Sequence, residues 1–299
     1  MNRIERRTFL RRLGAVGIWL PPALIAAGRA SGRTASGTLV RVRLGAVWPA
    51  GDPDLDGIRL GADEAGHAAR LFGTAFVLHQ AEGDGTRAGE AAERLIRDHD
   101  VLGIVGGATA VAADAIAAAA AAHDAVFLNV GTPREQLMQA CSPGTFHINA
   151  SEAMRRHALG TVRDSPAGAY ATGWHPSLER FGAGQVNDRF RRAFGRDLSE
   201  NGWYGWIAVK LLFDAAQRAG TESASELAEY LVSGRALFDG HKGLQLSFHP
   251  DTRQLRQPLY IVAGDRVIAQ VPEASALGDM THAELLDSVA GGKEATCAG

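Results

Sequence analysis

Two short loops, Gly106–Thr109 and Asn129–Thr132, hold the residue types best suited to binding chemistry. Each follows an apolar stretch and combines small residues with a threonine hydroxyl. At the start of a helix such a loop offers unpaired N–H groups and a partial positive charge, which favour an anionic group such as a carboxylate. Neither loop pairs a nucleophile with a base. The pattern therefore indicates a binding site, and no catalytic residue is predicted.

The chain around these loops alternates apolar stretches of strand length with stretches of helical spacing between Val40 and Thr132. After Thr109 the helix is rich in alanine, which favours helix formation and permits close packing on a sheet. Strands that alternate with helices of this length predict a parallel, doubly wound α/β sheet. The expected strands are residues 39–48, 76–78, 102–105, 125–130 and 146–149, and the expected helices are residues 58–72, 90–97, 109–122 and 152–161.

Beyond Thr161 the pattern changes to long amphipathic helices and short β segments. A strand near residues 169–172 precedes Trp174-His175-Pro176, and Gly264-Asp265 predicts a tight turn between the last two β segments. We therefore expect a second, reduced α+β lobe. Its expected helices are residues 178–194, 201–219 and 223–231, and its further β segments are residues 243–248, 258–262 and 266–271.

The first thirty residues have the layout of a cleavable export signal. Arg6-Arg7-Thr8-Phe9-Leu10 precedes a moderately apolar run, and Gly28-Arg29-Ala30 follows it. Paired arginines before Phe-Leu indicate the twin-arginine route. An uncleaved anchor is the alternative, although the run is shorter than a membrane span and contains Pro21-Pro22.

The charge balance bears on the class of partner. The formal net charge is −2, and removal of residues 1–30 would take away six arginines and only one glutamate. No basic cluster is left that could follow a phosphate backbone, so nucleic acid is not an expected partner. We expect a small organic molecule or another protein instead.

Cysteines and acidic residues give weak signals. Cys141 and Cys297 are the only cysteines; one bridge between them and two unpaired thiols are both open alternatives. Asp52–Gly57 imitates the opening of a calcium loop, with Asp63 at the twelfth position, but no helix precedes it and the closing residue is not glutamate. The aspartates also fit a solvated loop that caps the next helix. We expect neither a metal site nor a cofactor.

The residues between Arg41 and Thr132 resemble the first lobe of type I periplasmic binding proteins of the branched-chain amino-acid group. The likeness rests on Gly-x-x-x-Pro at residues 45–49, on Gly-x-x-x-Gly-Ala at residues 57–62, and on the two loops named above. Further segments resemble the branch associated with pyrroloquinoline-quinone-dependent alcohol dehydrogenase systems. These segments are residues 56–63, 141–147, 173–180, 240–243 and 255–258.

One departure from this family concerns the second lobe. Relatives carry several more strand–helix units after the helix that ends near Thr161, whereas Val162–Pro166 here leads directly to the next segment. A partner chain, or pairing of two copies through that face, would then supply the missing wall. The expected organisation is a twin-arginine-type signal peptide (1–30), an N-terminal α/β lobe (31–163), a reduced second lobe with helices that return to the first (164–283) and a flexible tail (284–299).

The resemblance also implies positions for ligand-binding residues. Thr109 and Ala110 match the hydroxyl loop that receives a ligand carboxylate, although Thr109 can equally be a plain helix cap. Arg134 could pair with an anionic ligand or be solvated, and Trp174 could face a cleft or pack in the core. The full predicted set is Trp48, Thr109, Ala110, Val130, Gly131, Thr132, Arg134, Trp174 and His175.

These observations lead to two hypotheses of function. The first is a periplasmic solute-binding component that recognises a small organic ligand for ABC-type transport or sensing, linked to quinone-dependent alcohol oxidation. Its partners would be an ABC permease or a periplasmic dehydrogenase subunit. The alternative is an accessory protein that has lost solute binding and associates with a dehydrogenase or transporter subunit. An enzyme, with His175 as its candidate residue, is the least expected.

Overall fold

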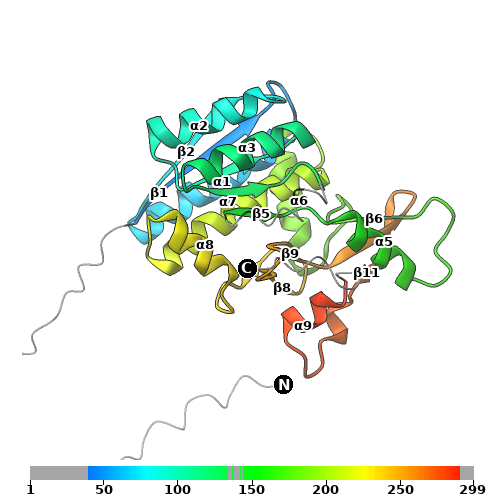
Figure 1. The fold of residues 1–299 in the computed structure, drawn as a ribbon. Coiled ribbons are helices and arrows are strands. Elements are labelled where there is room, and N and C mark those ends of the chain that lie inside the picture. The colour runs from blue at the N-terminus through cyan, green and yellow to red at the C-terminus, as the bar shows by residue number, and fades with distance from the viewer. Residues whose placement is uncertain (1–39, 134–136, 138–141, 143, 290–299) are drawn as a thin grey trace, which may run out of the picture. The chain divides into compact units, whose positions relative to one another are not determined.

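The first layer is a five-stranded parallel sheet in the order β2-β1-β3-β4-β5 (Figure 1). The computed structural model describes residues 40–133, 137, 142 and 144–289. The strand order reverses between β1 and β3, which is where open α/β sheets bind ligands. The predicted parallel, doubly wound sheet is confirmed. Its strands are β1 (Arg41–Trp48), β2 (Ala75–Glu82), β3 (Gly103–Gly106), β4 (Val126–Asn129) and β5 (Thr145–His147).

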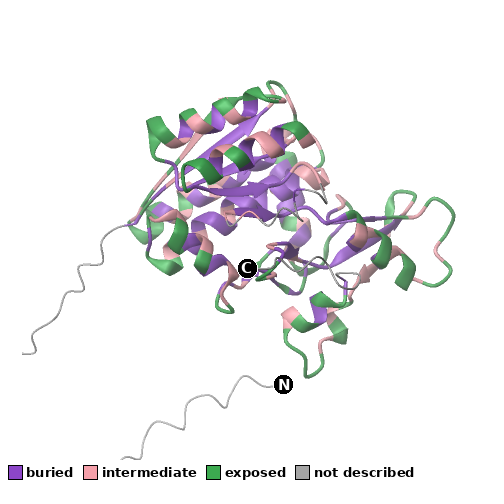
Figure 2. Ribbon diagram, viewed as in Figure 1, coloured by how far each residue is buried: buried purple, intermediate pink, exposed green. Residues whose placement is uncertain are grey.

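Helices cover both faces of this sheet, because successive strand residues point to opposite sides. Leu44 and Leu128 pack in the core with α1 and α7, whereas Phe127 packs with α2 and α3. Figure 2 shows burial concentrated in the strands and in α7, with exposed residues on the outer faces of α2 and α3. The helices are α1 (Leu55–Phe72), α2 (Arg87–His99), α3 (Ala110–Ala122), α7 (Glu200–Ala219) and α8 (Ala224–Val232).

Helices α1 and α7 approach each other closely through glycines. A Cβ atom on Gly57 would lie 1.9 Å from the carbonyl oxygen of Gly202, and one on Gly61 would lie 2.7 Å from that of Trp206. Side chains at these positions would therefore force the helices apart. The Gly-x-x-x-Gly spacing at residues 57–61 thus has a packing role.

The second sheet is antiparallel and has the order β11-β10-β6. Helix α5 packs on it through an apolar cluster that includes Met154, Leu259 and Ile261. A further small sheet has the order β7-β8-β9. The elements of this half are α5 (Glu152–Thr161), β6 (Tyr170–Thr172), η1 (Arg180–Gly182), α6 (Ala183–Phe194), β7 (Phe238–Asp239), β8 (Gln245–Phe248), β9 (Leu255–Arg256), β10 (Leu259–Ala263), β11 (Arg266–Val271), η2 (Ala274–Ala276) and α9 (His282–Asp287).

Two segments of this half differ from the sequence-based expectation. The helix expected from residue 178 begins only at Ala183, because Phe181 (φ 57°) and Gly182 (φ 86°) have left-handed backbone conformations that interrupt it. The flexible tail was expected to start at residue 284, but residues 284–287 belong to helix α9. There Thr281 and Glu284 form a capping box, and Leu285 is buried.

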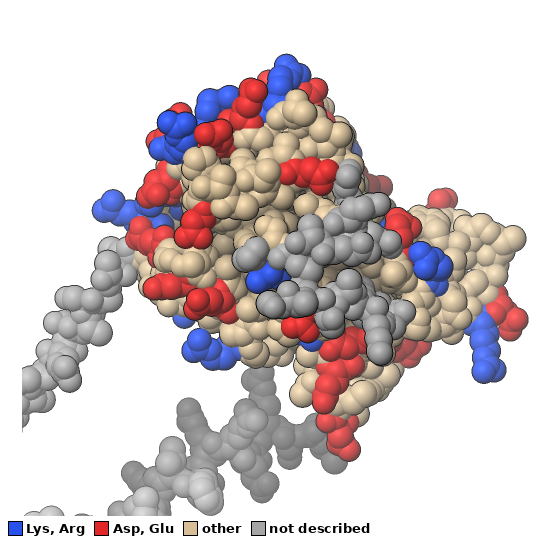
Figure 3. Space-filling model, viewed as in Figure 1, with Lys and Arg blue, Asp and Glu red and all other residues tan. Residues whose placement is uncertain are grey.

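Charged side chains are scattered over the face drawn in Figure 3, and the described residues there form no continuous basic patch. No helix within residues 40–133 or 144–289 combines the length and hydropathy that a membrane span needs. The predicted signal segment, Arg134, Cys141 and Cys297 lie outside the described residues.

Candidate functional site

The loops that follow β3 and β4 touch each other through glycine. A Cβ atom on Gly131 would lie 2.4 Å from the carbonyl oxygen of Gly107, and one on Gly107 would lie 2.5 Å from Oδ1 of Asn129. Gly107 also has a φ of 96°, a conformation that suits glycine. The two predicted loops are therefore brought together, as their small residues require.

Hydroxyl groups and helix N–H groups meet at this contact. Thr109 is the N-cap of α3, and its Oγ1 accepts a hydrogen bond of 3.2 Å from the N–H of Ala112. Oγ1 of Thr132 donates to the carbonyl of Ala108 over 3.5 Å. The N–H groups of Ala110 and Val111 have no hydrogen-bond partner among the described residues. The positive end of α3 is thus open to an acceptor.

Asn129 organises the second loop, a role that the sequence-based reasoning missed. Its side chain is fully buried. Nδ2 donates to the carbonyl of Thr132 at 2.8 Å, and Oδ1 accepts from the N–H of the same residue at 3.5 Å. An asparagine at the end of an otherwise apolar strand was the available signal, because a buried amide needs partners.

Trp48 lies at the end of β1 and packs on the α1 side of the sheet. Its side chain is buried, and its Nε1 has no hydrogen-bond partner in the described part of the chain. A cavity of about 170 Å³ lies beside it, between β1, β2 and α1. None of the residues that line this cavity belongs to the loops after β3 and β4. Those residues are Ala46, Trp48, Pro49, Ala50, Gly51, Leu55, Arg59, Gln80, Ala81 and Glu82.

Trp174 and His175 follow β6. Trp174 is buried, stacks on Trp203 with a centroid distance of 5.3 Å, and donates from Nε1 to Oδ1 of Asn187 at 2.9 Å. Its position is that of a core residue. Nδ1 of His175 lies 2.8 Å from Oγ of Ser177 and accepts from the N–H of that residue, and burial lowers the pKa of His175. No hydrogen bond or ring contact between described residues joins this pair to the two glycine loops.

The calcium-like loop makes contacts of another kind. The Asp56 carboxylate pairs with Arg59 and with Arg196, each at 3.0 Å. Oδ1 of Asp54 accepts from the hydroxyl of Ser199 at 2.6 Å. These aspartates therefore attach the start of α1 to residues 196–199, before α7.

Three of the segments that carry the more specific resemblance, residues 173–180, 240–243 and 255–258, meet around Trp203. Nζ of Lys242 lies 3.9 Å from the centroid of the Trp203 ring and donates to Oε1 of Gln257 at 2.7 Å. His241 stacks on Trp206 at 5.7 Å. Burial lowers the pKa of Lys242 well below its ordinary value. The stretches near residues 174, 242 and 257 are thus parts of one buried cluster.

Polar side chains also tie together the chain segments that pass between the sheets. Nε2 of Gln257 donates to the carbonyl of Ile148 at 2.6 Å. Oε1 of Glu200 accepts from the N–H of Gly173 and, at 2.7 Å, from the hydroxyl of Tyr204. It also pairs with Nη2 of Arg155 at 2.9 Å. The connections after β5, β6 and β9 are therefore held by α7 and by glutamine side chains.

The buried His147 predicts a pH-dependent stability. Burial, with a smaller contribution from Arg253, lowers its pKa to about 4, so protons bind more readily to the unfolded chain than to the folded one below pH 6.5. The free energy of unfolding is therefore unaffected by this histidine above about pH 6.5, and it decreases as the pH falls from there to about 4. The expected loss between pH 7 and pH 4 is about 3 kcal/mol. Urea unfolding of wild type and His147→Gln at both pH values measures it; equal losses in the two proteins would contradict it.

Within the glycine loops the described residues offer donors and hydroxyls but no nucleophile next to a base. Such an arrangement can hold an anionic group at the start of α3. Proton transfer or nucleophilic attack would need a different set of side chains.

Comparison with known proteins bears on this geometry. Residues 42–169 match the family model described as periplasmic binding protein. Among solved structures, a branched-chain amino-acid ABC transporter periplasmic ligand-binding protein from Burkholderia xenovorans shares the fold, with a TM-score of 0.67 at 12% identity over 80% of this chain and 97% of its own. The protein has the fold of the type I periplasmic binding proteins.

Two further structures with this periplasmic binding protein fold contain ligands. The isoleucine-bound branched-chain amino-acid transporter protein LivJ from Streptococcus pneumoniae has a TM-score of 0.64 at 12% identity, over 77% of this chain and 99% of its own. A leucine complex of an ABC transporter substrate-binding protein from Desulfitobacterium hafniense has a TM-score of 0.63 at 12% identity, over 76% and 99%. No curated protein matches the sequence.

Proposed function

We propose that this protein is a periplasmic solute-binding protein that holds the carboxylate end of a small organic ligand at the loops after β3 and β4. The observation that carries the proposal is the contact between Gly107 and Gly131, which brings two hydroxyl-bearing loops together at the start of α3. The open N–H groups of Ala110 and Val111 are the donors that a carboxylate needs there. Thr132, from the second loop, completes the site.

The comparisons support an amino acid as the first ligand class to test, because two proteins of this fold were solved with isoleucine and leucine. The proposed partner is an ABC permease, in line with the transporter names of these structures. The family match and Arg6-Arg7 support delivery to the periplasm by the twin-arginine route.

We also propose a link to quinone-dependent alcohol oxidation, which adds alcohols, aldehydes and short carboxylates to the candidate ligands. The support is the set of segments that resemble that branch, three of which share the cluster around Trp203 and Lys242. A reduced second lobe belongs to this proposal, since residues 162–169 alone connect α5 to β6. Pairing of two copies would then cover the ligand.

Thermal unfolding of the protein without residues 1–30 tests the ligand site. The panel contains branched-chain and aromatic amino acids, short carboxylates, alcohols and aldehydes. A true ligand at 100 times its dissociation constant is expected to raise the midpoint by about 5 to 10 °C. The rise is expected to disappear in Thr109→Ala and in Thr132→Val.

A matched control separates ligand contact from helix capping. Ser223 caps α8 as Thr109 caps α3. Each alanine substitution is therefore expected to lower the free energy of unfolding by about 1 kcal/mol, but Ser223→Ala should leave the ligand-induced rise of the midpoint intact. A shift that survives Thr109→Ala, or no shift with any solute, would overturn the proposal. The second outcome would favour an accessory protein whose partner is another chain.

A further inference from the structure

A second cavity lies beside the β10–β11 hairpin and shares no residue with the glycine loops. Its volume is about 410 Å³, which is within the range of small-molecule sites. Three segments form its walls: residues 177–181 after β6, the hairpin, and the η2 turn. The lining residues are Ser177, Leu178, Glu179, Arg180, Phe181, Tyr260, Val267, Ile268, Ala269, Gln270, Glu273, Ala274 and Ser275.

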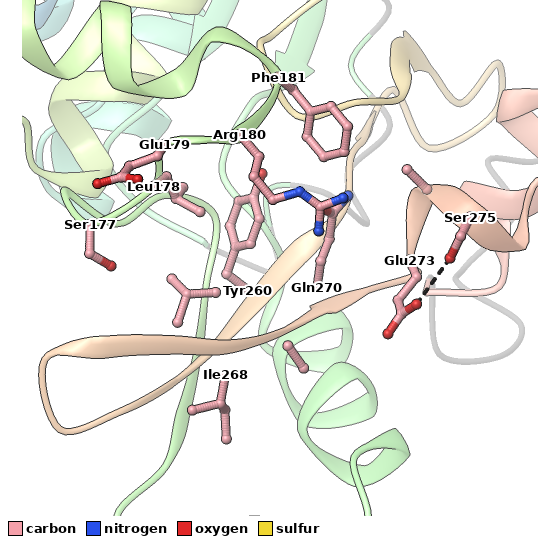
Figure 4. A pocket seen from close by; sticks show the side chains of 13 residues that line it. Ser177, Leu178, Glu179, Arg180, Phe181, Tyr260, Ile268, Gln270, Glu273 and Ser275 are labelled. Atoms are coloured by element: carbon pink, nitrogen blue, oxygen red, sulfur yellow. Dashed lines mark hydrogen bonds between the residues drawn. The ribbon is translucent and has the colours of Figure 1, made fainter.

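Arg180 supplies a positive charge to this cavity. Its guanidinium group points toward Gln270 and away from Glu179 (Figure 4). The group lies 4.9 Å from the centroid of the Phe181 ring and forms no hydrogen bond or ion pair with any described residue. An arginine placed in this way is free to bind a carboxylate with two parallel hydrogen bonds.

Glu273 supplies a negative charge on another wall. Its Oε2 accepts from the hydroxyl of Ser275 at 3.0 Å, which leaves Oε1 available. Within the described residues Glu273 and Arg180 form no ion pair, and Figure 4 shows them on separate walls. Gln270 also lines the cavity, and its Nε2 donates to the carbonyl of Lys242 at 2.9 Å, which fixes the amide. The cavity therefore presents opposite charges that do not neutralise each other directly.

Apolar side chains form the remaining walls. Ile268 is 46% exposed and Phe181 is 41% exposed, which is high for large apolar residues. The φ of 57° at Phe181 is uncommon for a bulky residue. It is held by Gly243, where a Cβ atom would lie 2.7 Å from the Phe181 ring, and by Nδ1 of His241, which lies 3.3 Å from the Phe181 carbonyl oxygen. The fold thus keeps an aromatic ring at the rim of the cavity.

We propose that this cavity is a second binding site, for a small zwitterion with an apolar side chain. Arg180 holds the carboxylate of the ligand and Glu273 holds its ammonium group. The apolar body lies against Phe181 and Ile268, and Tyr260 forms part of the wall. This site is separate from the proposed ligand loops, and either can exist without the other.

A methyl NMR titration with L-leucine as the probe separates the two sites. In protein labelled at isoleucine and valine methyl groups, Ile268 reports on the second cavity and Val111, at the start of α3, reports on the glycine loops. Binding at the second cavity is expected to shift the Ile268 resonance in the millimolar range. A shift of the Val111 resonance alone would overturn this proposal and support binding at the loops after β3 and β4. A shift of the Ile268 resonance alone would support the second cavity and count against leucine binding at those loops.

Charge variants test how the zwitterion is held. Arg180→Met is expected to weaken the leucine response of Ile268 at least tenfold, and Glu273→Gln is expected to weaken it similarly. The Glu273→Gln variant should not weaken binding of 4-methylpentanoate, which lacks the ammonium group. Arg192→Met, which removes an exposed arginine of α6, is the matched control and should leave the response unchanged. An Ile268 response that Arg180→Met leaves intact would overturn the proposal.

Discussion

Replacement of Glu200 by alanine is expected to lower the free energy of unfolding by about 3 kcal/mol. Glu200 is the common acceptor for the N–H of Gly173, the hydroxyl of Tyr204 and the guanidinium group of Arg155. Tyr204 is fully buried and the Arg155 side chain is only 20% exposed. Alanine would therefore leave the buried hydroxyl of Tyr204 and the buried N–H of Gly173 without this acceptor.

Urea unfolding of three variants measures this effect. Glu200→Gln keeps an oxygen acceptor but loses the charge, so its loss should be smaller than that of Glu200→Ala. Glu229→Ala removes an exposed glutamate of α8 and should change stability by less than about 0.5 kcal/mol. A loss below about 1 kcal/mol in Glu200→Ala would show that the hydrogen bonds and the ion pair of Glu200 contribute little to stability.

A single methyl group at Gly57 is expected to destabilise the protein by about 3 kcal/mol or more. Its position 1.9 Å from the carbonyl oxygen of Gly202 is too close for any neighbour to accommodate, because that neighbour is helix backbone. Helix α1 would have to move away from α7, and the apolar cluster between these helices and the sheet would open.

Gly66→Ala is the matched control for Gly57→Ala on the same helix. A Cβ atom at Gly66 meets nothing nearer than 3.9 Å, so alanine there should stabilise the helix by about 0.5 to 1 kcal/mol. Urea or thermal unfolding of the two variants compares them directly. Equal effects of the two substitutions would contradict the close approach of α1 and α7.

Much of the first half of the fold could be predicted because its signals are local. Alternating apolar strands and helices of fixed length leave few arrangements open, and the helix predicted at residues 152–161 matches α5. The meeting of the two glycine loops also followed from the pattern, since the ends of neighbouring parallel strands share an edge. Whether those loops bind a ligand stays a prediction.

The second half was harder to predict, because its interactions join residues distant in the sequence. No local pattern announces a left-handed phenylalanine, and Phe181 is held by Gly243, far along the chain. Strands β7 and β9 have two residues each, too few for a periodicity. Lys242 reads as a surface residue in the sequence, yet it is buried between the Trp203 ring and Gln257.

The packing of α1 against α7 sets an order of events during synthesis. All five strands of the parallel sheet leave the ribosome before α7 does, and α7 covers one apolar face of that sheet. Until then Leu44 and Leu128 lack the packing partners that α7 supplies. The N-terminal half therefore cannot complete its core while translation proceeds through α5 and α6, and must wait for α7 at residues 200–219.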